Sequence, residues 1–171
     1  MRTTIAVLSL LSMAACGGSD QSPSTAIEET APATKVHNLK EVAVADGVEI
    51  TLTGMKQTKQ AVPSMAAPPA GPDETFVVVN YKMKNTGGEP IDLFNRPTLE
   101  LVDGHGRAYS QDEVATTYLQ ISNDATSAAN DINPGITVSL TLVWKVAKKD
   151  FDPTTWKVIA KTSPELEFKL K

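Results

Sequence analysis

Residues 136–146 alternate between apolar and polar side chains over eleven positions, and only Val143 interrupts the pattern. Successive side chains of a β-strand point to opposite faces of the sheet, so a strand with one buried face shows a period of two. An α-helix would distribute the same apolar side chains around its axis. The segment therefore predicts a long strand that lines a hydrophobic core with one face.

Other short segments share this alternation, namely residues 48–53, 99–101, 156–158 and 166–170. Residues 75–83 are apolar at both parities, which is typical of a central strand covered on both faces, or of one whose outer face packs under a loop. Turn sequences separate these segments: Asp46-Gly47, Asn85-Thr86-Gly87-Gly88, Asp103-Gly104-His105-Gly106 and Asn133-Pro134-Gly135. We predict an all-β fold, an immunoglobulin-like antiparallel β-sandwich of about seven or eight strands.

Two segments depart from this pattern. Residues 61–73 contain four prolines, and because proline fits neither a helix interior nor a strand ladder, we expect a long irregular loop there. Ser110, followed three residues later by Glu113, forms the pattern of a capping box. We expect a short helix to begin at this box and to run toward Ile121.

The first sixteen residues show the pattern of a bacterial lipoprotein signal peptide. Residues 5–11 form an apolar run that is too short to span a bilayer, and two alanines precede Cys16. This end of the segment resembles the lipobox, with Met13 where the pattern prefers leucine. The resemblance implies that residues 1–15 are removed and that Cys16 is lipidated as the new N-terminus. Secretory cleavage at the same point without lipidation is the alternative.

The next segment has the composition of a linker. Residues 17–38 are rich in Ser, Thr, Pro, Ala and Glu, and they lack the bulky apolar side chains that would offset the entropy of ordering. We therefore predict a lipidated, flexible linker over residues 16–38 and a β-sandwich over residues 39–171. About twenty such residues span roughly 25 Å as a random coil. We expect His37, near the end of this linker, to be solvated rather than a metal ligand.

The chain carries 16 basic residues against 20 acidic ones, and this balance argues against nucleic acid as a partner. Removal of Arg2 with the signal peptide leaves a net charge of minus five, so we expect acyl chains on Cys16, and not attraction to anionic lipid, to hold the protein on the membrane. Gly17 stands where the enterobacterial sorting pattern places aspartate for inner-membrane retention. By that resemblance we expect the periplasmic or surface leaflet of the outer membrane, in a cell that has one.

Three segments carry a resemblance to a known family. They read FVVVNYKMKNTGGEPIDLF, LELVDGHGRAYS and INPGITVSLTLVWKV, and they lie within residues 75–147. They resemble a family of bacterial secreted and lipid-anchored immunoglobulin-like domains of unknown function. Some members are labelled telomere-repeat-binding-factor-like, and the fold is similar to that of a mycobacterial secreted immunoprotective antigen. The resemblance implies a β-sandwich and brings no catalytic residue with it.

The residues that could support catalysis are few. A serine nucleophile needs a neighbouring base, and the two histidines, His37 and His105, occur without a Gly-x-Ser-x-Gly sequence. His105 lies in an Asp-Gly-His-Gly sequence that is typical of a tight turn. The adjacent carboxylates Asp112 and Glu113 diverge and cannot face each other across a glycosidic bond. We therefore expect no enzymatic activity, no cofactor and no metal.

By elimination we predict a non-enzymatic, lipid-anchored binding domain of the cell envelope, whose ligand is an envelope protein, a glycan or a small molecule. Loops on a rigid sandwich commonly carry binding residues, so Met65, Pro68 and Pro69 of the proline-rich loop form the candidate binding loop. We expect deletion of residues 61–71 to abolish binding and to leave the fold intact.

The alternative is an envelope lipoprotein that handles a metal or sequesters a small ligand. Thioether and imidazole groups are soft ligands that suit copper. Under this hypothesis Met55, Met65 and His105 converge on one site. Met83 falls at a core-facing position of its predicted strand and is not part of it.

Overall fold

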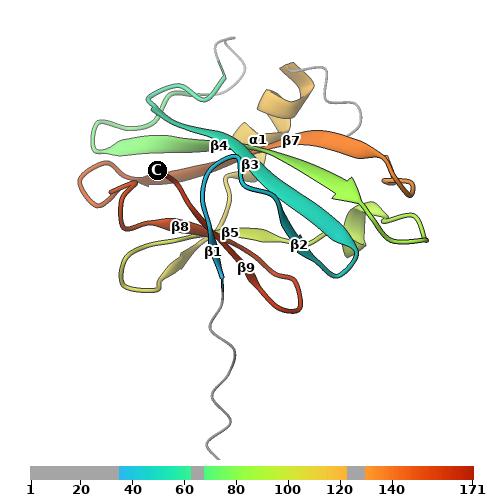
Figure 1. Ribbon diagram of the computed structural model, residues 1–171. Coiled ribbons are helices and arrows are strands. Elements are labelled where there is room, and N and C mark those ends of the chain that lie inside the picture. The colour runs from blue at the N-terminus through green and yellow to red at the C-terminus, as the bar shows by residue number, and fades with distance from the viewer. Residues whose placement is uncertain (1–34, 63–67, 123–129) are drawn as a thin grey trace, which may run out of the picture. The chain divides into compact units, whose positions relative to one another are not determined.

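The computed structural model describes residues 35–62, 68–122 and 130–171, which form two β-sheets packed face to face, together with one α-helix (Figure 1). The five-stranded sheet has the order β1 (Val36–His37), β9 (Leu166–Lys169), β8 (Lys157–Ala160), β5 (Leu99–Val102) and β6 (Ala108–Tyr109). The four-stranded sheet has the order β2 (Ala43–Ala45), β3 (Val48–Thr58), β4 (Glu74–Asn85) and β7 (Thr137–Ala147). A 3-10 helix, η1 (Leu93–Asn95), follows β4, and the helix α1 (Glu113–Ser122) precedes β7.

The predicted two-sheet architecture is confirmed, with two differences. The described residues contain nine strands instead of seven or eight, because β1, β2 and β6 are only two or three residues long and show no period in the sequence. All strand pairs are antiparallel except β1 with β9, which run parallel. The expectation of a purely antiparallel sandwich is therefore wrong for this pair.

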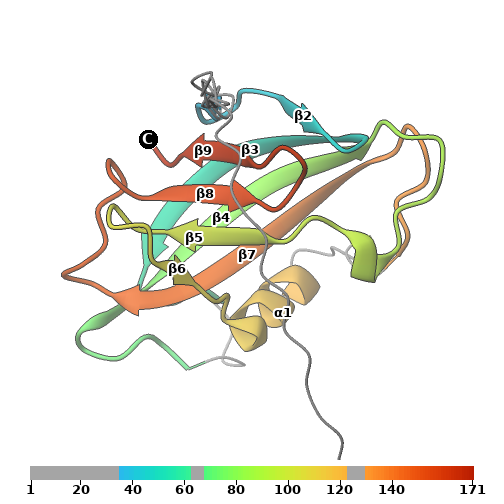
Figure 2. The same cartoon turned by 90° about the horizontal axis from the view of Figure 1, so that it is seen from below.

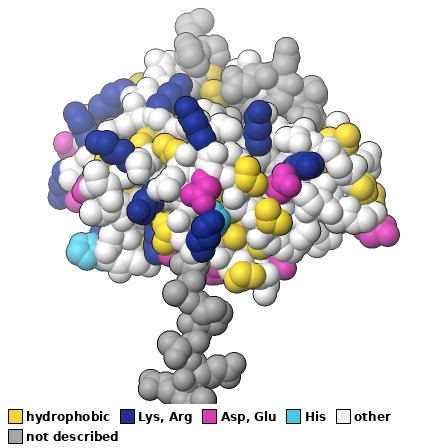
Figure 3. Space-filling model, viewed as in Figure 1, with side chains coloured by type: hydrophobic (Ala, Val, Ile, Leu, Met, Phe, Trp, Pro, Cys, Tyr) yellow, Lys and Arg dark blue, Asp and Glu magenta, His cyan; other side chains and the backbone are white. Residues whose placement is uncertain are grey.

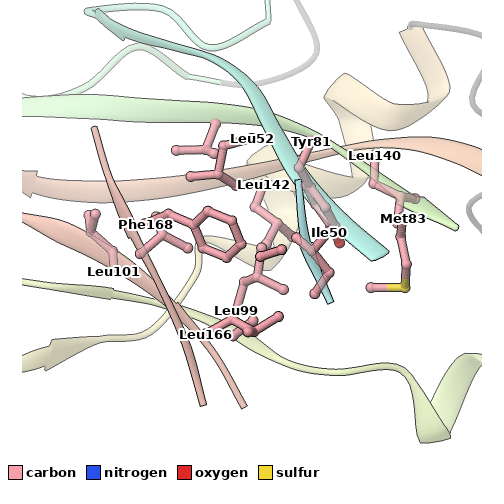
Figure 4. Packing of buried hydrophobic residues seen from close by; sticks show 14 of the residues in the cluster. Ile50, Leu52, Tyr81, Met83, Leu99, Leu101, Leu140, Leu142, Leu166 and Phe168 are labelled. Atoms are coloured by element: carbon pink, nitrogen blue, oxygen red, sulfur yellow. The ribbon is translucent and has the colours of Figure 1, made fainter. Parts of the chain in front are cut away.

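The main hydrophobic core lies between the two sheets. Both sheets contribute side chains to it, including Ile50, Leu52, Tyr81, Met83, Leu99, Leu101, Leu140, Leu142, Leu166 and Phe168 (Figure 4). Trp144 and Phe168 are the largest of the fully buried side chains. Met83 is fully buried here, as its strand parity predicts.

A second, smaller core covers the outer face of the four-stranded sheet. Phe76 and Val78 of β4 and Val143 of β7 point away from the main core and pack against Ala115 and Leu119 of α1. This packing explains why residues 75–83 are apolar at both parities, and why Val143 breaks the alternation of its strand. The interpretation of a central strand covered on both faces is confirmed for β4, which lies between β3 and β7.

Helix α1 also shields the outer edge of β7. The backbone N–H of Asp112 donates to the Val143 carbonyl over 2.7 Å, and the N–H of Val143 donates to Thr116 Oγ1 over 3.0 Å. These bonds pair backbone groups that an edge strand would otherwise expose to other chains (Figure 2). The predicted helix is confirmed, but the predicted capping box is wrong: Asp112 Oδ1, and not Ser110, accepts the N–H of Ala115.

Asn85 joins the two turn motifs that the sequence singles out. Its side chain is fully buried and donates to the carbonyls of Glu89 and Ile132 over 2.7 Å each, while its Oδ1 accepts the Gly87 N–H. The backbone N–H of Asn85 donates to the Ile136 carbonyl. The backbone carbonyl of Asn85 accepts the N–H of Gly135, which follows Pro134. The motifs of the β4 turn and the turn before β7 are therefore one hydrogen-bonded unit.

The β-sandwich begins earlier in the chain than predicted. Val36 and His37, assigned to the linker by composition, form β1, and His37 is 5% exposed, with its ring 5.5 Å from that of Phe168. Glu41 fixes this segment: its carboxylate accepts the Asn38 N–H and lies 3.3 Å from His37 Nδ1. The bond from Asn38, and then the ion pair with Lys35, lowers the pKa of Glu41 to about 2. The expectation of a solvated His37 is therefore wrong.

The proline-rich segment is anchored at both described ends. Ala61 and Val62 are buried in the second core. The ammonium group of Lys59 donates to the carbonyls of Gly71 and Pro72 over 2.8 Å each. The described part forms no helix or strand, as predicted, but deletion of residues 61–71 would remove core side chains. We therefore expect that deletion to destabilise the fold, contrary to the prediction from the sequence. Met65 lies outside the described residues.

Candidate functional site

Two of the three predicted binding-loop residues lie next to α1. Pro68 and Pro69 are exposed and line a shallow cleft of about 270 Å³ together with Val114 of the helix. Phe76 and Lys145 contribute to the same cleft from β4 and β7. The loop and the helix, which are far apart in the sequence, therefore form one surface.

The outward side of α1 is apolar. Val114, Tyr118 and Ile121 are 61%, 40% and 69% exposed, and their spacing of four and three residues places them on one side of the helix. We call Pro68, Pro69, Val114, Tyr118 and Ile121 the α1 surface. Contiguous exposed apolar side chains of this kind commonly mark an interaction site in a soluble domain.

Sequence reasoning missed the helical half of this surface. The spacing of Val114, Tyr118 and Ile121 was visible, but Ala115 and Leu119 show the same periodicity on the other side of the helix. The sequence alone does not say which of the two sides faces the sheet.

A second cleft, of about 340 Å³, lies between η1 and α1. Core residues such as Tyr81, Leu140 and Leu142 line it. Leu93 of η1 and polar side chains of α1, such as Thr117 and Gln120, line it as well. Burial raises the pKa of Tyr81 above its ordinary value, so its phenol is neutral at any physiological pH. Arg96 lines this cleft and donates to the carbonyl of Asn130. Phe94 of η1 is 94% exposed.

The residues of the predicted metal site lie on different parts of the sandwich. Met55 is half-buried on β3 against the main core, and His105 is exposed in the turn between β5 and β6. Met65 lies outside the described residues. In residues 35–62, 68–122 and 130–171, no group of three or more His, Cys, Asp or Glu side chains could hold a metal ion. The metal-handling alternative gains no support from this geometry and stays a prediction.

The turn that contains His105 is built around a buried carboxylate. Asp103 Oδ1 accepts the N–H groups of His105 and Arg107 over 2.9 Å each, and Oδ2 accepts Arg107 Nε and the Tyr109 hydroxyl. Burial acts to raise the pKa of Asp103, but the bonds from Arg107, His105 and Tyr109 outweigh it and hold that pKa well below its usual range. The turn interpretation of His105 is confirmed.

We expect Asp103→Asn to lower the melting temperature at neutral pH, because the amide cannot form the ion pair with Arg107. The pKa of the carboxylate is lower in the folded state than in the unfolded state. The ionised Asp103 therefore contributes its full stabilisation above about pH 4, the ordinary pKa of aspartate. This stabilisation is lost as the pH falls toward the pKa of the folded state. Thermal melts of both proteins should show a difference in melting temperature that stays constant from neutral pH down to about pH 4. Between about pH 4 and pH 2 this difference should shrink. A difference independent of pH would contradict this role.

Comparison with known proteins adds the family. Residues 37–161 match the domain of unknown function DUF4352. The chain belongs to the DUF4352 family. The matched segment begins in β1 and ends just after β8, so it covers most of the described domain.

Proteins similar to this DUF4352 chain occur in Bacillus and Clostridium species. The sequence is 28% identical, over 139 residues, to the uncharacterized protein YxkC of Bacillus subtilis. The alignment covers 80% of this chain and 76% of YxkC. A conserved hypothetical protein from Bacillus anthracis superposes with a TM-score of 0.66 at 20% identity, over 79% of this chain and 95% of its own. An uncharacterized β-sandwich protein from Clostridium difficile superposes with a TM-score of 0.53 at 18% identity, over 81% of this chain and 96% of its own. These two structures support the fold alone.

The predicted resemblance to a bacterial domain of unknown function with a β-sandwich fold is confirmed. The secreted or lipid-anchored character of that family stays a prediction for this chain. The immunoglobulin-like classification stays a prediction. Within the part of the DUF4352 chain that the structure describes, no helix is long and apolar enough to cross a membrane.

Proposed function

We propose that this protein is a lipid-anchored binding domain of the cell envelope, tethered through Cys16 and making contact through the α1 surface. The observation that carries the proposal is the exposed apolar row Val114, Tyr118 and Ile121 beside Pro68 and Pro69. A rigid sandwich holds this surface in place, because α1 is fixed by its packing on β4 and β7. The lipobox-like sequence before Cys16 supports the anchor.

A non-enzymatic role is part of this proposal. The titratable groups with the largest shifts of pKa are explained by local structure: Tyr81 is buried in the main core, Asp103 organises a turn, and Glu41 fixes the N-terminal segment. Active sites usually gather such groups in a cleft, next to a nucleophile or base. The cleft beside the α1 surface contains one lysine and one aspartate, and that aspartate, Asp112, is the cap of α1.

Photo-crosslinking tests the contact surface. Benzoylphenylalanine can replace Tyr118 on the α1 surface, or Phe94 on η1 as a matched exposed aromatic position. In intact cells we expect adducts, with protein or with lipid, to form from position 118 in clear excess over position 94. Equal yields at the two positions would place the contact elsewhere.

A further inference from the structure

Lysine side chains gather on the outer face of the four-stranded sheet. Lys56 of β3, Lys82 and Lys84 of β4, and Lys145 of β7 all lie at outward positions in the strand register. At about 3.4 Å per residue, these positions extend over roughly 27 Å of the sheet. Two acidic residues share these outward positions. Glu49 pairs with Lys84 over 3.7 Å, and Glu74, at the start of β4, accepts the Gly71 N–H over 3.0 Å. We call the four lysines the lysine face.

The outer face of the other sheet is balanced in charge. There Lys157 pairs with Glu167, and Lys161 lies 3.2 Å from Glu100 and 2.9 Å from Glu165. On the lysine face, by contrast, Lys56, Lys82 and Lys145 form no ion pair with any described residue. The chain as a whole is negatively charged, but the outer face of the four-stranded sheet carries an excess of positive charge.

The α1 surface lies on the same side of the molecule as the lysine face. Helix α1 packs on the outward residues Phe76, Val78 and Val143 of the four-stranded sheet, and its opposite side is exposed. Lys145 lines the cleft that Pro68 and Val114 form. In Figure 1 the four-stranded sheet and α1 form the upper layer, and the same view in Figure 3 shows lysine and arginine side chains over that layer.

We propose that this side of the domain docks on an anionic phospholipid bilayer, with the lysine face against the phosphate groups and the α1 surface at the level of the headgroups. Basic side chains combined with exposed apolar ones are the chemistry by which peripheral domains bind such membranes. The proposal rests on the proposed function, and it names the bilayer as the partner of the α1 surface.

The length of chain before the described domain permits this docking. Residues 17–34 separate Cys16 from the first described residue, and a chain of this length reaches roughly 60 Å when fully extended. A domain of this size has a radius of gyration of about 14 Å. An anchor at Cys16 would therefore keep the lysine face within reach of the bilayer. The acyl chains then provide the hold, and the lysine face provides the orientation.

Vesicle flotation tests the proposal without the anchor. The probe protein is the chain from residue 16 with Cys16→Ser, and the vesicles contain either phosphatidylcholine alone or an equimolar mixture with phosphatidylglycerol. We expect binding to the mixed vesicles at about 0.01 M salt, little binding to phosphatidylcholine, and a steep loss toward about 0.3 M salt.

The double variant Lys56→Gln/Lys82→Gln should bind about 25-fold more weakly, since each lysine near the surface contributes about fivefold. Val114→Ser/Ile121→Ser should weaken binding without changing its dependence on salt.

Lys169→Gln is the matched control, because Lys169 is exposed on the outer face of the five-stranded sheet. It should leave binding unchanged, and thermal melts should show that all variants are folded. Absence of binding to the mixed vesicles, or equal binding by the lysine variants and Lys169→Gln, would overturn the proposal. Lysine-dependent binding to soluble polyphosphate without binding to vesicles would overturn it in favour of a soluble polyanion. If vesicle binding failed in this way but crosslinking from position 118 still gave protein adducts, the bilayer proposal would be wrong and the proposed binding function would be retained.

Discussion

Replacement of Asn85 by alanine is expected to lower the free energy of unfolding by about 2–4 kcal/mol. The change would remove three hydrogen bonds of a fully buried side chain, two to the carbonyls of Glu89 and Ile132 and one from the Gly87 N–H. A typical hydrogen bond contributes about 0.5–1.5 kcal/mol to stability. Such a loss is a large part of the total stability of a single domain. Urea denaturation of both proteins measures it.

Asn95→Ala is the matched control for this prediction, because the Asn95 side chain is exposed and donates to the carboxylate of Asp92, the N-cap of η1. It should change stability by well under 1 kcal/mol. Asn85→Asp should be at least as harmful as Asn85→Ala, since a carboxylate would face two carbonyl oxygens. If all three variants were equally stable, the account of the joined turns would be wrong.

Cys16→Ser is expected to move the protein from the membrane fraction to the soluble fraction almost completely. Burial of an acyl chain contributes about 0.8 kcal/mol per methylene, and two or three chains on one cysteine form a durable anchor that serine cannot carry. Fractionation after a high-salt wash, which removes charge-based binding, measures the change. Mass spectrometry of the N-terminal peptide should show the acyl mass on Cys16 in the parent protein.

Ser19→Ala, three residues further along, is the control and should stay on the membrane. Retention of the Cys16→Ser protein after the salt wash, or an unmodified Cys16 in the parent, would refute the anchor. Secretory cleavage without lipidation would then be the better interpretation.

Patterns that repeat within one strand were enough to predict the sheets. The alternation at 136–146 gives β7, and the apolar residues at both parities in 75–83 give a strand buried on two sides. Even the interruption at Val143 carried information, because it marks the contact with α1. These features depend on one element and its burial, so the sequence of that element suffices.

Features that depend on two distant segments could not be predicted in the same way. The linker composition around His37 conceals a short strand, because the parallel pairing with β9 and the packing on Phe168 offset the entropy of ordering. The cap of α1 is Asp112 instead of Ser110, because the chain leaves the edge of β7 at that residue. The α1 surface likewise depends on which side of the helix packs on the sheet.

The crosslinking yield at Tyr118 relative to Phe94, measured in cells with Cys16 and in cells with Cys16→Ser, tests the central claim most directly. The claim is that an anchored sandwich makes contact through the side of the four-stranded sheet that carries α1. It predicts a ratio well above one in cells with Cys16, and a marked fall once the anchor is lost. A ratio near one with the anchor intact would contradict it.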